Sequence, residues 1–131
     1  ISDAIGARIQ QAGHRTVALL GTRRTMEGHF YPERLHKHAG AKVITPDLNE
    51  RVEVDRIIHE ELAKGVMQTG SREYIGDLIR NLCEGGAEAV VLGCSELTSI
   101  VTPAPGALPF YDTTRLHAEA AVKRALEVTY A

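Results

Sequence analysis

The sequence predicts an α/β fold in which a parallel β-sheet is flanked by helices. Two apolar segments, residues 16–20 and 90–92, show no alternation of polar and apolar side chains, which is typical of strands covered on both faces. Between them lie stretches with apolar residues at helical spacing, punctuated by glycine. Strands that alternate with helices in this way favour parallel pairing, and ligands of such sheets bind at the carboxyl ends of the strands.

Capping residues set the boundaries expected in the first half of the chain. Thr25 and Asp47 are the predicted N-caps, because their side chains can accept hydrogen bonds from unpaired N–H groups at helix starts. Gly13, Gly40 and Gly65 mark helix ends. The elements expected are a helix at 1–12, a strand at 16–20, a helix at about 26–39, a strand at 42–44, and a helix that follows Asp47 and ends near Gly65.

The second half repeats this alternation. Ser71 is expected to head a helix that Gly85 and Gly86 end, and its apolar side chains recur at helical spacing. The strand before Cys94 follows, and then a short helix after Ser95. The remaining expected elements are a loop with Pro103, Pro105 and Gly106, a brief strand at 108–111, and a helix from Asp112 to about Val128.

Residues 89–99 are the most informative segment, because they bring a thiol and a hydroxyl to a helix start. Gly93 permits a tight turn, and Cys94 is expected beside the unpaired N–H groups of the next helix, whose positive end lowers a thiol pKa. Those groups and the Ser95 hydroxyl can hold a substrate carboxylate. Glu96 suits the helix dipole and can also orient a substrate ammonium. The alternative interpretation is that Cys94 is a buried structural cysteine.

Two further segments contribute candidate binding residues. Thr22 and Thr25 place two hydroxyls at a strand end, where they can bind a carboxylate together with backbone N–H groups, although Thr25 can equally be only an N-cap. Lys64, before a helix stop, is either a cation at the negative end of a helix or a fixed positive charge near a dicarboxylate. The glycine pattern matches neither G-x-G-x-x-G nor a Walker A sequence.

Composition excludes several classes of function. The 131 residues have a formal charge of −2, without the basic patch of a nucleic-acid or membrane-surface protein, and no apolar stretch approaches a transmembrane helix. Two cysteines make no disulfide framework, and Cys83 is expected in the core. The histidines lack metal-ligand spacing, and only His117 is retained as a candidate supporting residue. A cytoplasmic protein fits best.

Three segments together resemble the aspartate/glutamate racemase family, the cofactor-independent two-cysteine racemases, in its aspartate branch. They are residues 19–26, 91–96 and 112–120. Members of that family have two similar α/β lobes, each of which offers one catalytic cysteine to a site between them. The resemblance implies that Cys94 is one of two acid/base thiols that exchange the α-proton, with no metal and no pyridoxal phosphate. The substrate-binding residues that it implies are Thr22, Thr25, Lys64, Ser95 and Glu96.

The first lobe of that family, with its own cysteine, is absent from these residues. The resemblance implies that residues 1–107 are the second lobe, with the Cys94 site, and that residues 108–131 are a strand and helix that return to the missing lobe. We therefore expect a truncated or cleaved chain with little or no racemase activity alone. The expected partners are a small amino acid or dicarboxylate substrate and the missing N-terminal lobe, and the exposed surface is compatible with a homo-oligomer.

Two other functions remain open. One is a single-cysteine decarboxylase or cis-trans isomerase of the same superfamily, which would act on malonate-like or maleate-like acids. The other is a non-catalytic carboxylate-binding or assembly module, since a fold alone does not establish a reaction.

Overall fold

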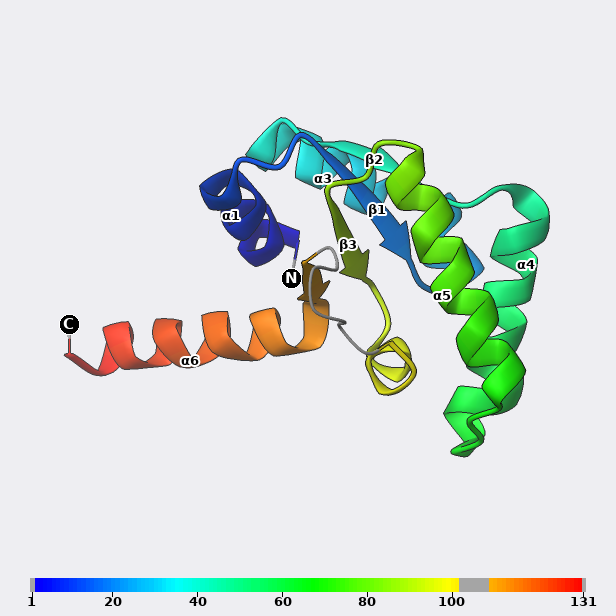
Figure 1. The fold of residues 1–131 in the computed structure, drawn as a ribbon. Helices are drawn as coiled ribbons and strands as arrows, with labels where there is room; N and C mark the ends of the chain where they lie inside the picture. The colour runs from blue at the N-terminus through cyan, green and yellow to red at the C-terminus, as the bar shows by residue number, and fades with distance from the viewer. Residues whose placement is uncertain (1, 102–108, 131) are drawn as a thin grey trace.

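Four parallel strands form one sheet in the computed structural model, which describes residues 2–101 and 109–130. The strands are β1 (Thr16–Leu20), β2 (Lys42–Ile44), β3 (Ala89–Leu92) and β4 (Phe110–Asp112), in the order β2-β1-β3-β4. All three pairings are parallel, which confirms the predicted α/β class (Figure 1). Leu108 of the expected last strand lies outside the described residues, as do Pro103, Pro105 and Gly106 of the expected loop.

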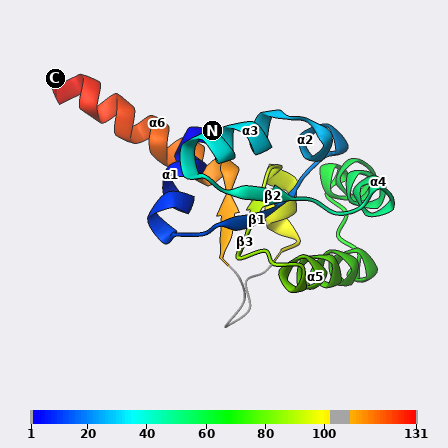
Figure 2. The same cartoon turned by 90° about the horizontal axis from the view of Figure 1, so that it is seen from above.

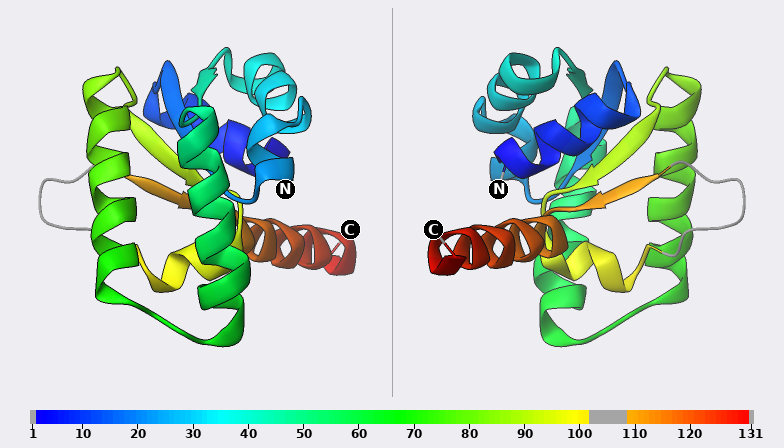
Figure 3. Two further views of the ribbon diagram at one scale, coloured as in Figure 1. Left: turned by 90° about the vertical axis from the view of Figure 1, so that its right-hand side faces the viewer. Right: turned by 90° about the vertical axis from the view of Figure 1, so that its left-hand side faces the viewer.

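Helices cover both faces of this sheet (Figure 2). Helices α1 (Ser2–Ala12) and α3 (Phe30–Ala39) pack on one face, whereas α4 (Leu48–Arg56) and α5 (Thr69–Glu84) pack on the other (Figure 3). Successive residues of β1 and β3 enter the two cores alternately, so both strands are buried on both faces. This double coverage explains why their sequences are continuous apolar runs.

The prediction of one continuous helix at about 26–39 is wrong, both in where the helix begins and in its being unbroken. The segment is divided into α2 (Arg23–Glu27) and α3, because Gly28 adopts an extended conformation (φ −73°, ψ 164°) between them. The N-cap is Thr22, which is extended and accepts the Thr25 N–H, so Thr25 lies within α2 instead of capping it. Two hydroxyl residues three apart made either one a plausible cap, and the backbone conformation selects the first.

The helix after Asp47 changes its winding before it ends. Asp47 caps α4 in a capping box with Glu50, as its side chain predicted. The helix then passes into the π-helix η1 (Ile57–Glu61) and a 3₁₀ turn, η2 (Leu62–Lys64), and Gly65 ends it in the left-handed conformation (φ 75°). The wide turn of η1 directs Glu61 into the interior, where it is only 4% exposed.

Ser71 does not head the next helix, since α5 begins two residues earlier with Gln68 in the N-cap position. Its side chain is instead buried, and its hydroxyl donates a hydrogen bond to Glu61 Oε1 at 2.6 Å. The other carboxylate oxygen of Glu61 lies 3.1 Å from Arg56 Nη2. Two partners therefore satisfy this buried carboxylate, and they tie the end of α4 to α5.

Cys83, on α5, is partly exposed and does not belong to either core cluster of the described residues, contrary to the prediction that it is a core residue. Burial still raises the pKa of its thiol, with a backbone hydrogen bond and the Glu84 carboxylate as smaller influences. Cys83 lies in the last turn of α5 and not in a loop at the carboxyl ends of the strands.

The last helix, α6 (Thr113–Tyr130), begins where expected and extends away from the sheet (Figure 1). Asp112 Oδ1 accepts the N–H groups of Thr114 and Arg115 at 3.0 and 3.2 Å, which makes it the cap. Leu116 packs against the α1 side of the core, whereas residues 117–127 are all exposed. Among the described residues, no helix combines the length and the apolar character that a membrane span requires.

We predict that Ser71→Ala lowers the free energy of unfolding by about 1–3 kcal/mol, because it leaves the buried Glu61 carboxylate with one hydrogen bond fewer. Ser99→Ala is the matched control, since its exposed hydroxyl donates to the Glu96 carbonyl, and we expect a change within about 0.5 kcal/mol. Urea denaturation measures both variants. Equal losses would contradict a stabilising role for the Ser71–Glu61 contact.

Candidate active site

The residues that follow β1, β3 and β4 meet at one edge of the sheet. Strands β1, β3 and β4 are parallel neighbours, so the residues that follow each of them emerge at the same edge. The pairing of β1 with β3 continues one residue past β3, because the Gly93 N–H donates to the Leu20 carbonyl at 2.8 Å. This contact brings the Cys94 loop beside the loop that carries Thr22 and Thr25.

Glycine at position 93 lets these two loops approach closely. A Cβ atom placed on Gly93 would lie 2.9 Å from Thr25 Cγ2, a distance that real Cβ atoms essentially never show. The methyl group of Thr25 therefore occupies the space beside Gly93, and its hydroxyl lies 3.1 Å from the Thr22 hydroxyl. The two threonine oxygens form a polar pair next to the thiol loop.

Cys94 lies in the N-cap position of η3 (Ser95–Ser99), a 3₁₀ helix of five residues. Its Sγ–H donates to Glu96 Oε2 at 2.7 Å, and the Ser95 hydroxyl donates to the same oxygen at 3.2 Å. Cys94 and Glu96 are partly buried, whereas Ser95 is exposed. One carboxylate oxygen thus accepts both the thiol and the hydroxyl, so these three candidate residues form a single hydrogen-bonded group.

The predicted lowering of the thiol pKa is wrong. Burial is the largest cause of the shift, and together with the Glu96 carboxylate it raises the pKa of Cys94 to about 11. Hydrogen bonds from the backbone of Glu96 and Leu97 act in the predicted direction but are outweighed. At neutral pH the side chain is therefore a thiol whose proton points at a carboxylate.

The hydrogen bond between Cys94 and Glu96 raises the pKa of the thiol but lowers that of the carboxyl group. The hydrogen bond from Cys94 is the largest influence that lowers the pKa of the Glu96 carboxyl group, with smaller contributions from its backbone, from Ser95 and from the charge of His59. Glu96 is thus held as an anion at neutral pH. A fixed negative charge beside a neutral thiol favours the approach of a cation, such as a substrate ammonium.

Lys64 is the last residue of η2, the turn that lies near the group of Cys94, Ser95 and Glu96. The turn η2 packs against η3, and the Lys64 side chain is exposed. Lys64 is therefore an exposed cation at a helix end.

The structure points to a different histidine from the one retained in the sequence analysis. His117 is exposed on α6. His59, on η1, is close enough for its charge to act on Glu96, and its Nε2 lies 3.4 Å from Asp55 Oδ1. Its spacing of four residues from Asp55 was visible in the sequence. Its relation to Glu96 depends on tertiary packing, in which η2, directly after η1, contacts η3.

A pocket of about 230 Å³ lies elsewhere, between α1, β4 and α6. Tyr111, Arg8 and Arg115 are among its lining residues, and both arginines are ion-paired with Glu119. Cys94, Thr25 and Glu96 do not line it, so this pocket is separate from the candidate site at the strand ends. Among the described residues, no three His, Cys, Asp or Glu side chains are grouped as a metal ion would require.

The chain is similar in sequence and in fold to known proteins. The profile of the Asp/Glu/hydantoin racemase family matches residues 1–121. A candidate Asp/Glu racemase from Yersinia pestis has a similar structure, with a TM-score of 0.90 and 42% sequence identity. An aspartate racemase homologue from Pyrococcus horikoshii aligns with a TM-score of 0.84 and 32% identity. Each alignment covers 95% of this chain and 54% of the other, so the chain spans about half the length of these relatives.

A third solved structure, an aspartate racemase from Picrophilus torridus, shares the fold at 20% identity and a TM-score of 0.63. That alignment covers 85% of this chain and 45% of the other.

We predict that alkylation of Cys94 by iodoacetamide, in a Cys83→Ser background, reaches its half-maximal rate near the thiol pKa of about 11. Only the thiolate reacts, so the rate follows the deprotonated fraction. Glu96→Gln should move this midpoint to lower pH, because it removes a charge that opposes the thiolate. The exposed Glu73→Gln variant is the control, and an unchanged midpoint in Glu96→Gln would contradict the Cys94–Glu96 contact.

We also predict that Gly93→Ala destabilises the chain by about 1–3 kcal/mol, because the added methyl group collides with Thr25. Adding Thr25→Ser, which deletes Cγ2, should recover part of this loss. Gly76→Ala is the control, since its Cβ would meet nothing within 4 Å. Thermal denaturation measures the set, and a Gly93→Ala variant as stable as Gly76→Ala would show that the two loops are not in close contact.

Proposed function

The chain belongs to the Asp/Glu/hydantoin racemase family, and on this premise we propose that it is the Cys94 half of an amino-acid racemase that acts on aspartate or a close relative. The observation that supports this best is the hydrogen-bonded group of Cys94, Ser95 and Glu96 at the strand ends, beside the hydroxyls of Thr22 and Thr25. A proton donor there adjoins groups that can bind a carboxylate and an ammonium.

In the proposed reaction, Cys94 is one of two acid/base groups. Racemisation requires a base on one face of the α-carbon to remove the proton and an acid on the opposite face to return one. The Cys94 thiol is protonated at neutral pH, so it is poised as the acid that transfers its proton to the α-carbon and becomes a thiolate. In the reverse direction this thiolate accepts the α-proton. The proposal needs neither a metal ion nor pyridoxal phosphate for these steps.

The neighbouring side chains are assigned to substrate binding. Glu96 would accept a hydrogen bond from the substrate ammonium group. This hydrogen bond would compete with the one that the Cys94 thiol donates to the same carboxylate. Thr22, Thr25 and Ser95 would donate hydroxyl hydrogen bonds to a substrate carboxylate, and Lys64 would pair with the second carboxylate of a dicarboxylic amino acid.

The second acid/base group would come from the part of the relatives that this chain does not cover. We infer that this part also closes the Cys94 site from water, which would strengthen the electrostatic interactions inside it. The division at residue 107, with the segment after it directed to the missing lobe, belongs to the same proposal. The strand of that segment, β4, pairs with β3 in the sheet of this chain, so α6 is the part that extends away from it. The exposed length of α6 is compatible with that arrangement and also with association between two copies.

A second candidate deserves a direct test because Cys94 is held as a thiol. A single protonated thiol suffices to protonate the enediolate that remains when a malonate-like acid loses carbon dioxide, whereas racemisation needs two groups. A simple binding module, the third alternative, would bind aspartate and be stabilised by it without any proton transfer.

The test is proton NMR of α-hydrogen exchange in heavy water, with L-aspartate and D-aspartate separately and Cys94→Ala as the control. We expect the chain alone to exchange the α-proton of one enantiomer with retention, and to racemise aspartate only when the complementary half is added. Conversion of a malonate-like or maleate-like acid instead would favour the second candidate. Absence of exchange with the complementary half present would contradict the racemase proposal.

A further inference from the structure

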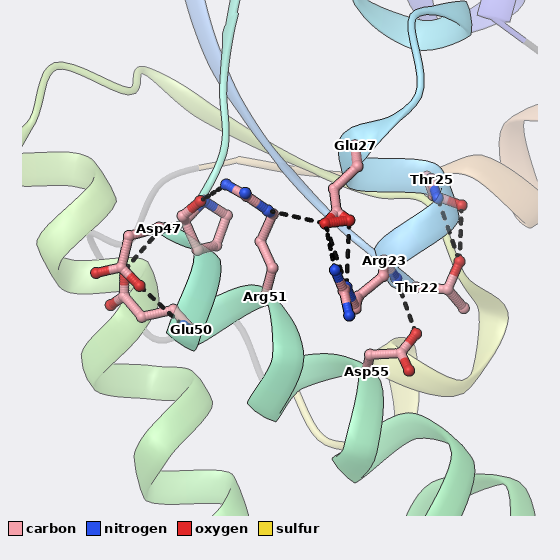
Figure 4. Close-up of polar contacts among 9 residues, drawn as sticks. Thr22, Arg23, Thr25, Glu27, Asp47, Glu50, Arg51 and Asp55 are labelled. Atoms are coloured by element: carbon pink, nitrogen blue, oxygen red, sulfur yellow. Dashed lines mark hydrogen bonds and ion pairs between the residues drawn. The ribbon is translucent and has the colours of Figure 1, made fainter.

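Asp55, on α4, is hydrogen-bonded to the start of α2, the segment that carries Thr22 and Thr25. Its Oδ1 accepts the backbone N–H of Arg23 at 2.8 Å, and Arg23 is the first residue of α2 (Figure 4). His59 Nε2 lies 3.4 Å from the same oxygen. A carboxylate that accepts a backbone N–H at a helix start forms a charge-assisted hydrogen bond, which is stronger than one between neutral groups.

Helix α2 depends on such contacts because it has only five residues. An isolated helix of that length is not stable in water, so its neighbours must hold it in place. Thr22 accepts the Thr25 N–H from within the segment, whereas Asp55 is supplied by α4, 32 residues later in the chain. Met26 is the buried residue of α2 and joins it to the core.

A second link between α2 and α4 is weaker. Arg23 pairs with Glu27 through both carboxylate oxygens, and Arg51 Nε lies 3.8 Å from Glu27 Oε1 (Figure 4). These side chains are partly or largely exposed, and ion pairs of this kind contribute little to stability. Asp55 therefore makes the stronger of the two connections.

The position of α2 decides where the two threonine hydroxyls stand. On one side, Thr25 is limited by its close approach to Gly93. On the other side, the hydrogen bond to Asp55 holds the backbone of Arg23, the residue that follows Thr22. Loss of this bond would let the helix start move while the Cys94 loop stays attached to β1.

We propose that Asp55 is a positioning residue for the substrate carboxylate, because its hydrogen bond to the Arg23 N–H holds the Thr22 and Thr25 hydroxyls beside the Cys94 loop. Asp55 does not touch the substrate in this proposal and acts through the backbone of α2. The inference rests on the proposed function, since it assigns a role to a site that must bind a carboxylate.

Two pairs of variants separate the hydrogen bond from the charge. Asp55→Ala removes the acceptor, whereas Asp55→Asn keeps an oxygen that can accept the Arg23 N–H. Arg23→Pro removes the donor at a first-turn position that tolerates proline, after a Thr22 backbone that is already extended, whereas Arg23→Ala keeps the N–H. Glu27→Gln breaks the neighbouring ion pairs alone.

The measurement is protection of Cys94 from iodoacetamide by L-aspartate, in a Cys83→Ser background, together with hydrogen exchange of the Arg23 amide where it is present. Asp55→Ala and Arg23→Pro should each raise the half-protecting aspartate concentration about fivefold or more, the equivalent of one lost hydrogen bond. Asp55→Asn, Arg23→Ala and Glu27→Gln should stay within about twofold of the parent, as expected for exposed polar changes. The Arg23 amide should exchange faster in Asp55→Ala but not in Asp55→Asn.

The outcomes distinguish this inference from the proposed function. Protection of the parent chain with equal protection of Asp55→Ala and Arg23→Pro would overturn the role of Asp55 and leave the proposed function intact. No protection of the parent chain would overturn the proposed carboxylate site itself, and the role of Asp55 with it. Because Arg23→Pro leaves Asp55 in place, a failure of Asp55→Ala to fold does not prevent the decision.

Discussion

The close pairing of β1 with β3 is the constraint on which the candidate site depends. It joins parts of the chain about seventy residues apart, and the hydrogen bond from Gly93 to Leu20 extends it to the first residue after the strand. Because no side chain at position 93 separates the loops, Thr25 can lie directly against the backbone that leads to Cys94. The hydroxyl pair, the thiol and Glu96 are neighbours only for this reason, and α2 and η3 are too short to place them independently.

Opposing influences act on the pKa of the Cys94 thiol, and those of burial and of the Glu96 carboxylate are the larger. The backbone N–H groups of a short 3₁₀ turn favour the thiolate, but desolvation and the adjacent Glu96 anion favour the thiol more strongly. The residue therefore rests as a proton donor. A bound ammonium that pairs with Glu96 would remove part of the opposition to the thiolate, so the proposed substrate would itself adjust the acidity of the group that acts on it.

Sequence reasoning identified the features that depend on local pattern. The continuous apolar runs of β1 and β3, the Asp47 cap and the glycine stops are readable from neighbouring residues, and the structure confirms them. It failed where tertiary contacts decide. Thr22 rather than Thr25 caps α2, Ser71 turns inward to Glu61, and His59 rather than His117 lies near Glu96. The direction of the Cys94 pKa shift was missed because burial, which the sequence does not state, exceeds the effect of the helix end.

The π-helical turn η1 determines the direction in which the side chains of the following residues point. Such a turn holds one residue more than an α-helical turn, so the residues beyond it are rotated by about 100° around the axis relative to an uninterrupted α-helix. With this offset Glu61 faces Ser71 and the Lys64 turn faces η3. Without this offset, the residues that follow η1 would face a different side of the molecule. The winding of one helical turn thus decides which side chains face α5 and η3.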